Sequence, residues 1–129
     1  MGNISPRRCL VAEDQALIAM ALEAYLEEVG IEIVGPFASC EQALAWAESG
    51  TPDVALLDYK LKDGPCTQLA RTLLERGVPV VIYSGYPQGP DTPPELRDVI
   101  WIEKPVERAK LLDVLVDVCS HKPAVALQS

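Results

Sequence analysis

Short apolar runs alternate along the chain with longer segments in which apolar residues recur every three or four positions. The short continuous runs are typical of strands that are buried on both faces of a parallel sheet, and the longer spacing is typical of helices that pack on such a sheet. The alternation predicts five strands, at residues 9–12, 31–37, 53–58, 78–83 and 99–103. A crossover follows each of the first four, so we predict an α/β fold with a doubly wound, five-stranded parallel sheet.

Glycine, proline and a capping pair mark the ends of the predicted helices. Gly30 closes the first helix, and Ser39 with Gln42 forms a capping box at the start of the second. The fourth crossover contains four prolines, so any helix there is short and begins near Pro94. The other helices are predicted over residues 15–29, 39–47, 64–74 and 105–121. This (βα)5 succession matches the flavodoxin-like arrangement, with strand order 2-1-3-4-5.

Length and composition indicate one domain. The chain has 129 residues, a size that a single core usually supports, and 49% of its residues are hydrophobic while 23% are charged. We expect a single domain over residues 1–129, with its core at about 8–120. Residues 121–129 form a tail that is too short to fold alone, so no effector domain is expected.

Charge and cysteine usage exclude several classes of protein. A net charge of −8 and a pI near 4.5 argue against nucleic-acid binding, because that affinity comes from clustered Lys and Arg. No apolar run approaches the roughly 20 residues that cross a bilayer, and the N-terminus has no signal-peptide core. The four cysteines are scattered without a CxxC pair, which predicts reduced thiols rather than a zinc site. We therefore expect a cytoplasmic protein without membrane association.

Polar side chains follow the predicted strands at their carboxyl ends. They are Glu13 and Asp14 after the first strand, Asp58 after the third, Ser84 after the fourth and Lys104 after the fifth. The carboxyl ends of parallel strands meet at one edge of a doubly wound sheet, and that edge is where such folds bind ligands. Single carboxylates at strand ends are common as helix caps, but a set of five polar positions in register is better explained by a functional site.

The chemistry of this set points to phosphoryl transfer. Three neighbouring carboxylates repel one another unless a cation lies among them, and Mg²⁺ prefers such oxygen ligands. Its charge would neutralise an incoming phosphoryl group, while Ser84 and Lys104 would hold the remaining phosphoryl oxygens. Asp58 lies at the centre and is the predicted nucleophile, giving an acyl phosphate.

These motifs also carry a family resemblance, which extends over about residues 8–120. The chain resembles the receiver domain of two-component response regulators in Glu13-Asp14, Leu56-Leu57-Asp58, Ser84-Gly85 and Lys104-Pro105, taken in this order and spacing. It looks like the stand-alone, single-domain type. Ser84-Gly85-Tyr86 is also similar, more weakly, to a subgroup with a Thr-Gly-Tyr-like motif after the fourth strand.

The resemblance implies the source of the phosphoryl group and the ligands of the metal. A sensor histidine kinase, or a histidine phosphotransfer protein, would phosphorylate Asp58 in the presence of Mg²⁺. The metal ligands would be the carboxylates of Glu13, Asp14 and Asp58 and the main-chain carbonyl of Lys60.

The same resemblance implies how the phosphoryl group is detected. Ser84 and Lys104 would contact it, the Lys104–Pro105 peptide bond would be cis, and Trp101 would act as the switch residue, at a position where receivers usually have Tyr or Phe. Lys62 stands where many receivers have Pro, and Cys66 where they usually have Gly. These departures predict a different turn after the phosphoacceptor.

The output is expected to be a protein contact. Apolar residues go nearly round the last predicted helix, so we predict exposed apolar surface beside Trp101 that changes on phosphorylation. An unknown output protein would bind there, or a second copy of the chain would form a homodimer through the fifth strand and the last helix. The chain could instead serve as a phosphorelay intermediate or a phosphate sink. No enzyme activity is expected beyond self-catalysed phosphorylation and slow autodephosphorylation of Asp58.

Three alternatives remain open at this point. A receiver-like scaffold that acts without phosphorylation would keep the fold and lose the chemistry. A phosphatase of the haloacid-dehalogenase kind needs a second Asp two residues after its Asp nucleophile, where this chain has Lys60. A flavodoxin-like electron carrier needs a Ser-, Thr- and Gly-rich loop after the first strand, where Glu13-Asp14-Gln15 would repel the flavin phosphate.

Overall fold

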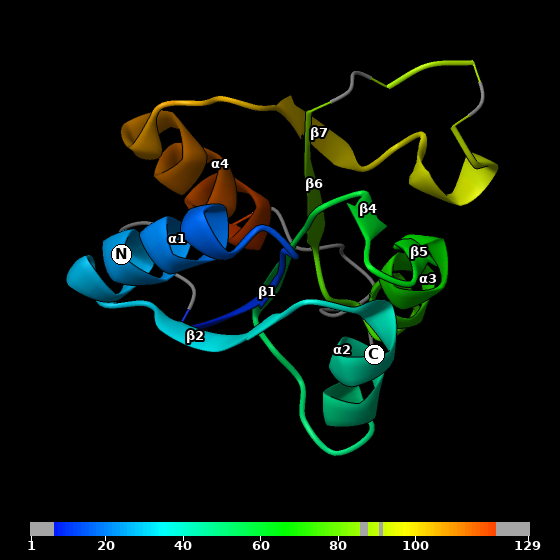
Figure 1. The fold of residues 1–129 in the computed structure, drawn as a ribbon, viewed down its shortest axis with the longest axis horizontal. Coiled ribbons are helices and arrows are strands. Elements are labelled where there is room, and N and C mark those ends of the chain that lie inside the picture. The colour runs from blue at the N-terminus through cyan, green and yellow to red at the C-terminus, as the bar shows by residue number, and fades with distance from the viewer. Residues whose placement is uncertain (1–6, 86–87, 91, 121–129) are drawn as a thin grey trace.

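Five parallel strands form the central sheet of the computed structural model, which describes residues 7–85, 88–90 and 92–120. Their order across the sheet is β2-β1-β3-β6-β7, which is the predicted order 2-1-3-4-5 when only these strands are counted (Figure 1). The strands are β1 (Arg8–Ala12), β2 (Glu32–Phe37), β3 (Val54–Leu57), β6 (Val80–Ser84) and β7 (Ile100–Glu103). The predicted α/β class and topology are confirmed.

Helices cover the sheet on both faces. Figure 1 shows α1 (Ala16–Glu28) and α4 (Arg108–Ser120) on one side, and α2 (Cys40–Ala47) and α3 (Thr67–Glu75) on the other. Successive strand residues point alternately to these two layers, so each buried strand contributes to two cores. In β3, for example, Leu56 packs with the α1 and α4 layer while Leu57 packs with the α2 and α3 layer. This two-sided burial explains why the strands read as continuous apolar runs.

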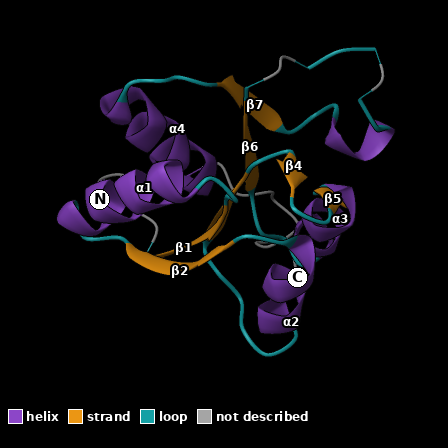
Figure 2. Cartoon of the chain, viewed as in Figure 1, coloured by secondary structure: helices purple, strands orange, loops and turns teal. Residues whose placement is uncertain are grey.

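The fourth crossover contains a single short 3₁₀ helix, η1 (Pro94–Leu96), in its described residues (Figure 2). The prediction of a short helix near Pro94 is confirmed. Leu96 is fully buried in the core on the α2 and α3 side. A segment with so many prolines cannot supply the backbone donors of a long helix.

The helix ends predicted from Gly30 and Ser39 are confirmed, and the helix start predicted at Gly64 is wrong. Gly30 has φ +90°, the left-handed conformation expected at a glycine C-cap, and the Ser39 hydroxyl accepts a hydrogen bond from the Gln42 amide at 3.2 Å. The helix predicted to open at Gly64 begins instead at Thr67. Before it, the short strands β4 (Lys60–Leu61) and β5 (Gly64–Pro65) form an antiparallel pair. The turn after Asp58 is thus a small hairpin.

Trp101 and the last helix, which are predicted to share an interaction surface, pack against different cores. Trp101 packs with the α2 and α3 layer, whereas α4 packs on the opposite face of the sheet. In α4 the larger apolar residues are buried or half-buried, and Asp113 and Asp117 are exposed. The most exposed large apolar side chains belong to α1 instead, Leu17 at 83% and Met20 at 63%. Apolar residues nearly encircle α4 in sequence, but neighbouring side chains cover most of their surface.

The four cysteines are free and buried, which confirms the expectation of packed thiols. Burial raises the pKa of the Cys9 and Cys66 thiols to about 12, so these groups stay protonated at neutral pH. Within the described ranges, no helix has both the length and the apolar character needed to cross a membrane.

Candidate functional site

The polar residues predicted from the strand ends lie together at the carboxyl edge of the sheet. Main-chain hydrogen bonds between neighbouring strands fix their positions. The amide of Asp58 donates to the carbonyl oxygen of Ala12 at 2.8 Å, and the amide of Lys104 donates to that of Ser84 at 2.7 Å. The first bond fixes Asp58 beside the end of β1, and the second fixes Lys104 beside the end of β6.

Lys104 bridges two carboxylates at this edge. Its ammonium nitrogen lies 2.8 Å from Glu13 Oε1 and 3.3 Å from Asp58 Oδ2. The exposed fractions of the three side chains are 14% for Lys104, 1% for Glu13 and 11% for Asp58. Such pairs are screened much less than surface ion pairs, so removing one partner leaves an uncompensated, largely buried charge.

Burial and charge shift the pKa values of this group. Desolvation, followed by the negative charge of Glu13, raises the pKa of the Asp58 carboxyl to about 6, although Lys104 acts in the opposite direction. Burial lowers the pKa of Lys104, but its hydrogen bond to Glu13 and the charge of Asp58 outweigh burial and raise the pKa overall. The site therefore favours a fixed ammonium and penalises a negative Asp58 that lacks further positive charge.

Asp14 completes a set of three carboxylates. Oxygen atoms of Glu13, Asp14 and Asp58, one from each, all lie within 4.8 Å of one another. This all-oxygen donor set and the penalised charge of Asp58 fit a hard divalent cation, which would supply the missing positive charge. Lys60 is the first residue of β4, and its side chain is exposed.

The residues expected to detect a phosphoryl group lie at the end of β6, on β7 and directly after β7. Ser84 is buried at the end of β6, and the Lys104–Pro105 peptide bond is cis. Trp101 lies in β7, where its ring packs against that of Tyr59 with a centroid distance of 5.4 Å. Tyr86, the last residue of the Thr-Gly-Tyr-like motif, lies outside the described residues.

Asp63 is an important residue of this region that the sequence analysis did not single out. It lies in the turn between β4 and β5, and its carboxylate accepts hydrogen bonds from the amides of Cys40 at 2.8 Å and Glu41 at 3.0 Å. These amides belong to the first turn of α2, so Asp63 caps a helix from a distant part of the chain. The Lys62-Asp63-Gly64 sequence signals a turn, but it gives no sign of the helix that the side chain reaches.

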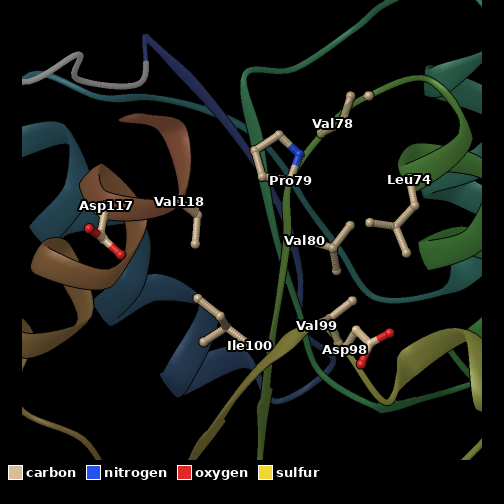
Figure 3. Close-up of a pocket in the computed structure, with 10 residues that line it drawn as sticks. Leu74, Val78, Pro79, Val80, Asp98, Val99, Ile100, Asp117 and Val118 are labelled. Carbon is tan, nitrogen blue, oxygen red and sulfur yellow. The ribbon is translucent and has the colours of Figure 1, made fainter. Parts of the chain in front are cut away.

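An apolar pocket lies at the opposite edge of the sheet, at the amino ends of β6 and β7. Figure 3 shows its walls, to which Leu74, Val80, Ile100 and Val118 contribute, with Asp98 and Asp117 at the margin. None of the predicted site residues lines this pocket. The polar chemistry of the described residues is concentrated at the other edge.

Comparisons with known proteins agree with this geometry. A family model described as the response regulator receiver domain matches residues 9–116. The transcriptional regulatory protein PdtaR of Mycobacterium tuberculosis is 38% identical over 85 residues, which cover 64% of this chain and 41% of PdtaR. The matched part of the chain thus spans less than half the length of this relative.

Solved structures show the same fold. A CheY-like response regulator receiver protein of Methanospirillum hungatei JF-1 superposes with a TM-score of 0.80 and 26% identity, covering 91% of this chain and 96% of its own. The receiver domain of the sensor histidine kinase PA1611 of Pseudomonas aeruginosa PAO1 gives a TM-score of 0.75 and 24% identity, covering 89% and 98%. That structure has a magnesium ion coordinated in its active-site cleft.

Proposed function

The chain belongs to the response regulator receiver domain family, and from this premise we propose that Asp58 accepts a phosphoryl group from a sensor histidine kinase or a histidine phosphotransfer protein. The observation that carries the proposal is the position of the Asp58 carboxylate, which lies 3.3 Å from Lys104 and forms a set with Glu13 and Asp14. In the transfer, an Asp58 carboxylate oxygen bonds to phosphorus as the phosphorus–nitrogen bond of the donor phosphohistidine breaks. The electron pair of that bond leaves with the imidazole nitrogen.

Residues of the chain would hold Mg²⁺ at this site. We assign the carboxylates of Glu13, Asp14 and Asp58 and the main-chain carbonyl of Lys60 as its protein ligands. When bound, the ion supplies positive charge that offsets the charge of the carboxylates and of the phosphoryl group.

Three other roles in the transfer belong to Asp58, Lys104 and Ser84. With a pKa of about 6, Asp58 is mostly ionised at pH 7 and can act as the nucleophile. Lys104 reaches both acidic partners and can turn its ammonium toward a phosphoryl oxygen with little movement. The Ser84 hydroxyl contacts another phosphoryl oxygen, and catalysis consists mainly of positioning and charge stabilisation.

The phosphodonor docks on the α1 side of the site. Leu17 and Met20 expose apolar surface there, within two turns of Asp14. A groove between α1 and α4 continues this surface, with Tyr25, Val106 and Leu111 among its lining residues. This apolar surface suits a donor, because the donor must bring its phosphohistidine to Asp58 and the surface lies near that residue.

Receivers are generally signalling proteins rather than enzymes, and we extend this to the present chain. Its output is a phosphorylation-dependent protein contact, or the onward transfer or storage of the phosphoryl group, in the cytoplasm. A homodimer through β7 and α4 stays a prediction.

Intact mass measured after incubation with acetyl phosphate and Mg²⁺ tests the proposal. We expect one added phosphoryl group in the wild type, none in Asp58→Asn, and none with EDTA. Asp63→Asn is the matched control, since it removes an aspartate five residues away in the same loop, and it should still be phosphorylated. If the wild type gains no phosphoryl group and also fails to bind beryllofluoride, the chain is a scaffold that acts without phosphorylation.

A further inference from the structure

An aromatic pair links the phosphoacceptor loop to the edge of the sheet. The rings of Tyr59 and Trp101 lie 5.4 Å apart between centroids, with an angle of 46° between their planes. This is within the range of favourable tilted aromatic contacts. Tyr59 directly follows Asp58, and Trp101 comes three residues before Lys104. The pair therefore joins segments next to two residues of the proposed phosphorylation site.

The main chain of Tyr59 is held on both sides. Its carbonyl oxygen accepts a hydrogen bond from the Cys66 amide at 2.7 Å, and the preceding residue, Asp58, donates to Ala12 at 2.8 Å. The hairpin that follows is tied to α2 by Asp63. With its backbone fixed in this way, the Tyr59 ring provides a stable surface for another ring.

Trp101 occupies a less enclosed position. It is half-buried in β7, an edge strand that pairs on one side only, with β6. On its face of the sheet, the described residues of the fourth crossover provide η1 rather than a full helix. Tyr59 is the aromatic ring that packs against Trp101 among the described residues. The Tyr59 ring thus covers part of the Trp101 side chain.

We propose that Tyr59 is a positioning residue, which holds Trp101 in the orientation of the unphosphorylated protein. The inference rests on the proposed function, since it assigns a role to the residue that follows the phosphoacceptor. Phosphorylation draws Lys104 toward the phosphoryl group, and β7 transmits that movement three residues back to Trp101. The ring contact belongs to one of the two arrangements, so it shifts the equilibrium toward that arrangement.

The size of the expected shift follows from the energy of an aromatic pair. Such a pair changes an equilibrium constant by roughly two- to tenfold beyond the effect of its buried area. Loss of the Tyr59 ring should favour the phosphorylated arrangement by that factor. A ligand that selects this arrangement, such as beryllofluoride with Mg²⁺, should then bind more tightly by the same factor, provided that the arrangement is a minor one in the free protein.

Fluorescence of Trp101 tests this in a Trp46→Phe background, which leaves Trp101 as the single tryptophan. We expect Tyr59→Leu to increase acrylamide quenching of Trp101 before any ligand is added and to tighten beryllofluoride binding about two- to tenfold. Tyr59→Phe, which keeps the ring, should restore both properties. Phe37→Leu is the matched control, since it removes an aromatic ring packed on the same core but at the end of β2, on the opposite edge of the sheet from β7, and it should change neither.

Two outcomes separate this inference from the proposed function. If Tyr59→Leu leaves both the quenching and the beryllofluoride affinity equal to those of Tyr59→Phe, Tyr59 does not position Trp101. Intact mass with acetyl phosphate is measured on the same samples. Phosphorylation of Asp58 with unchanged fluorescence overturns the positioning role alone, whereas no phosphorylation in the Trp46→Phe parent overturns the function on which it rests.

Discussion

Two aspartates five residues apart in one loop have opposite electrostatic environments. Asp58 is largely buried beside Glu13, and its pKa is raised to about 6. Asp63 is exposed at the tip of the following hairpin, and the amides of Cys40 and Glu41 hold its pKa below the usual range. The same side chain is thus destabilised as an anion at one position and stabilised as an anion at the other.

The difference separates the proposed phosphoacceptor from a structural carboxylate. Hydrogen bonds from two amides satisfy Asp63, so its charge needs no further partner. Asp58 shares Lys104 with Glu13, and one ammonium cannot fully compensate two largely buried carboxylates. The site therefore needs further positive charge, which a bound divalent cation would supply.

Replacing Lys104 should have the largest effect on stability, because it removes the ammonium that pairs with the carboxylates of Asp58 and Glu13. In the absence of divalent ions, Lys104→Met leaves two uncompensated carboxylates, and the free energy of unfolding should fall by about 3 kcal/mol. Urea denaturation in EDTA measures the loss. Mg²⁺ should recover part of it, since a cation at the carboxylates would replace the missing charge.

Lys110→Met is the matched control for that experiment. Lys110 is exposed on α4, and its replacement should change the free energy of unfolding by less than about 0.5 kcal/mol. Equal stability of Lys104→Met and wild type in EDTA would mean that the ammonium does not stabilise the carboxylates.

Asp58→Asn should have a smaller effect, in the stabilising direction. The pKa of Asp58 is about 6 in the folded protein, whereas its ordinary value is 3.8. The folded protein therefore binds this proton more tightly than the unfolded chain does. Wild-type stability therefore falls as pH rises from about 4 to about 6, and the Asn variant lacks this decline. Without metal at pH 7, the variant should be more stable by on the order of 2 kcal/mol.

Urea titrations of both proteins from pH 4 to pH 8 in EDTA measure this difference. The gap should be small near pH 4 and open by pH 7. A constant gap over the whole range would show that Asp58 does not titrate with a raised pKa.

The strand ends of the site could be predicted from sequence because their position follows from topology. Parallel strands bring their carboxyl ends to one edge, so recognising five strands was enough to place Glu13, Asp58, Ser84 and Lys104 together. The side chain of Trp101 could not be placed in this way. Its strand has apolar residues on both faces, and a shift of one residue in register exchanges the faces.

Long-range capping was also beyond prediction from sequence. Asp63 lies 23 residues from Cys40, and the hydrogen bond between them exists only because the fold brings the β4–β5 turn and α2 together. The extent of apolar surface on the last helix could not be predicted for a related reason. Apolar residues on several sides predicted an exposed surface, but the extent of cover depends on neighbours that are distant in the sequence.

Replacing Asp63 should have the smallest effect and the opposite dependence on pH. An Asn at this position keeps one acceptor oxygen and loses the negative charge at the start of α2, so Asp63→Asn should lower the free energy of unfolding modestly at pH 7. The lowered pKa means that the folded protein releases this proton more readily than the unfolded chain. The contribution of Asp63 is therefore present above the unfolded pKa and is lost as pH falls through the folded pKa.

The two aspartates can then be compared by how the difference in unfolding free energy between wild type and variant changes with pH. As pH rises from acid toward neutral, Asp63 should stabilise the wild type relative to Asp63→Asn, while Asp58 should destabilise the wild type relative to Asp58→Asn. Urea titrations from pH 3 to pH 7 in EDTA measure both differences under the same conditions. Slopes of the same sign would contradict the assignment, because a carboxylate stabilised by amide donors and one penalised by burial beside another carboxylate cannot respond alike to the removal of a proton.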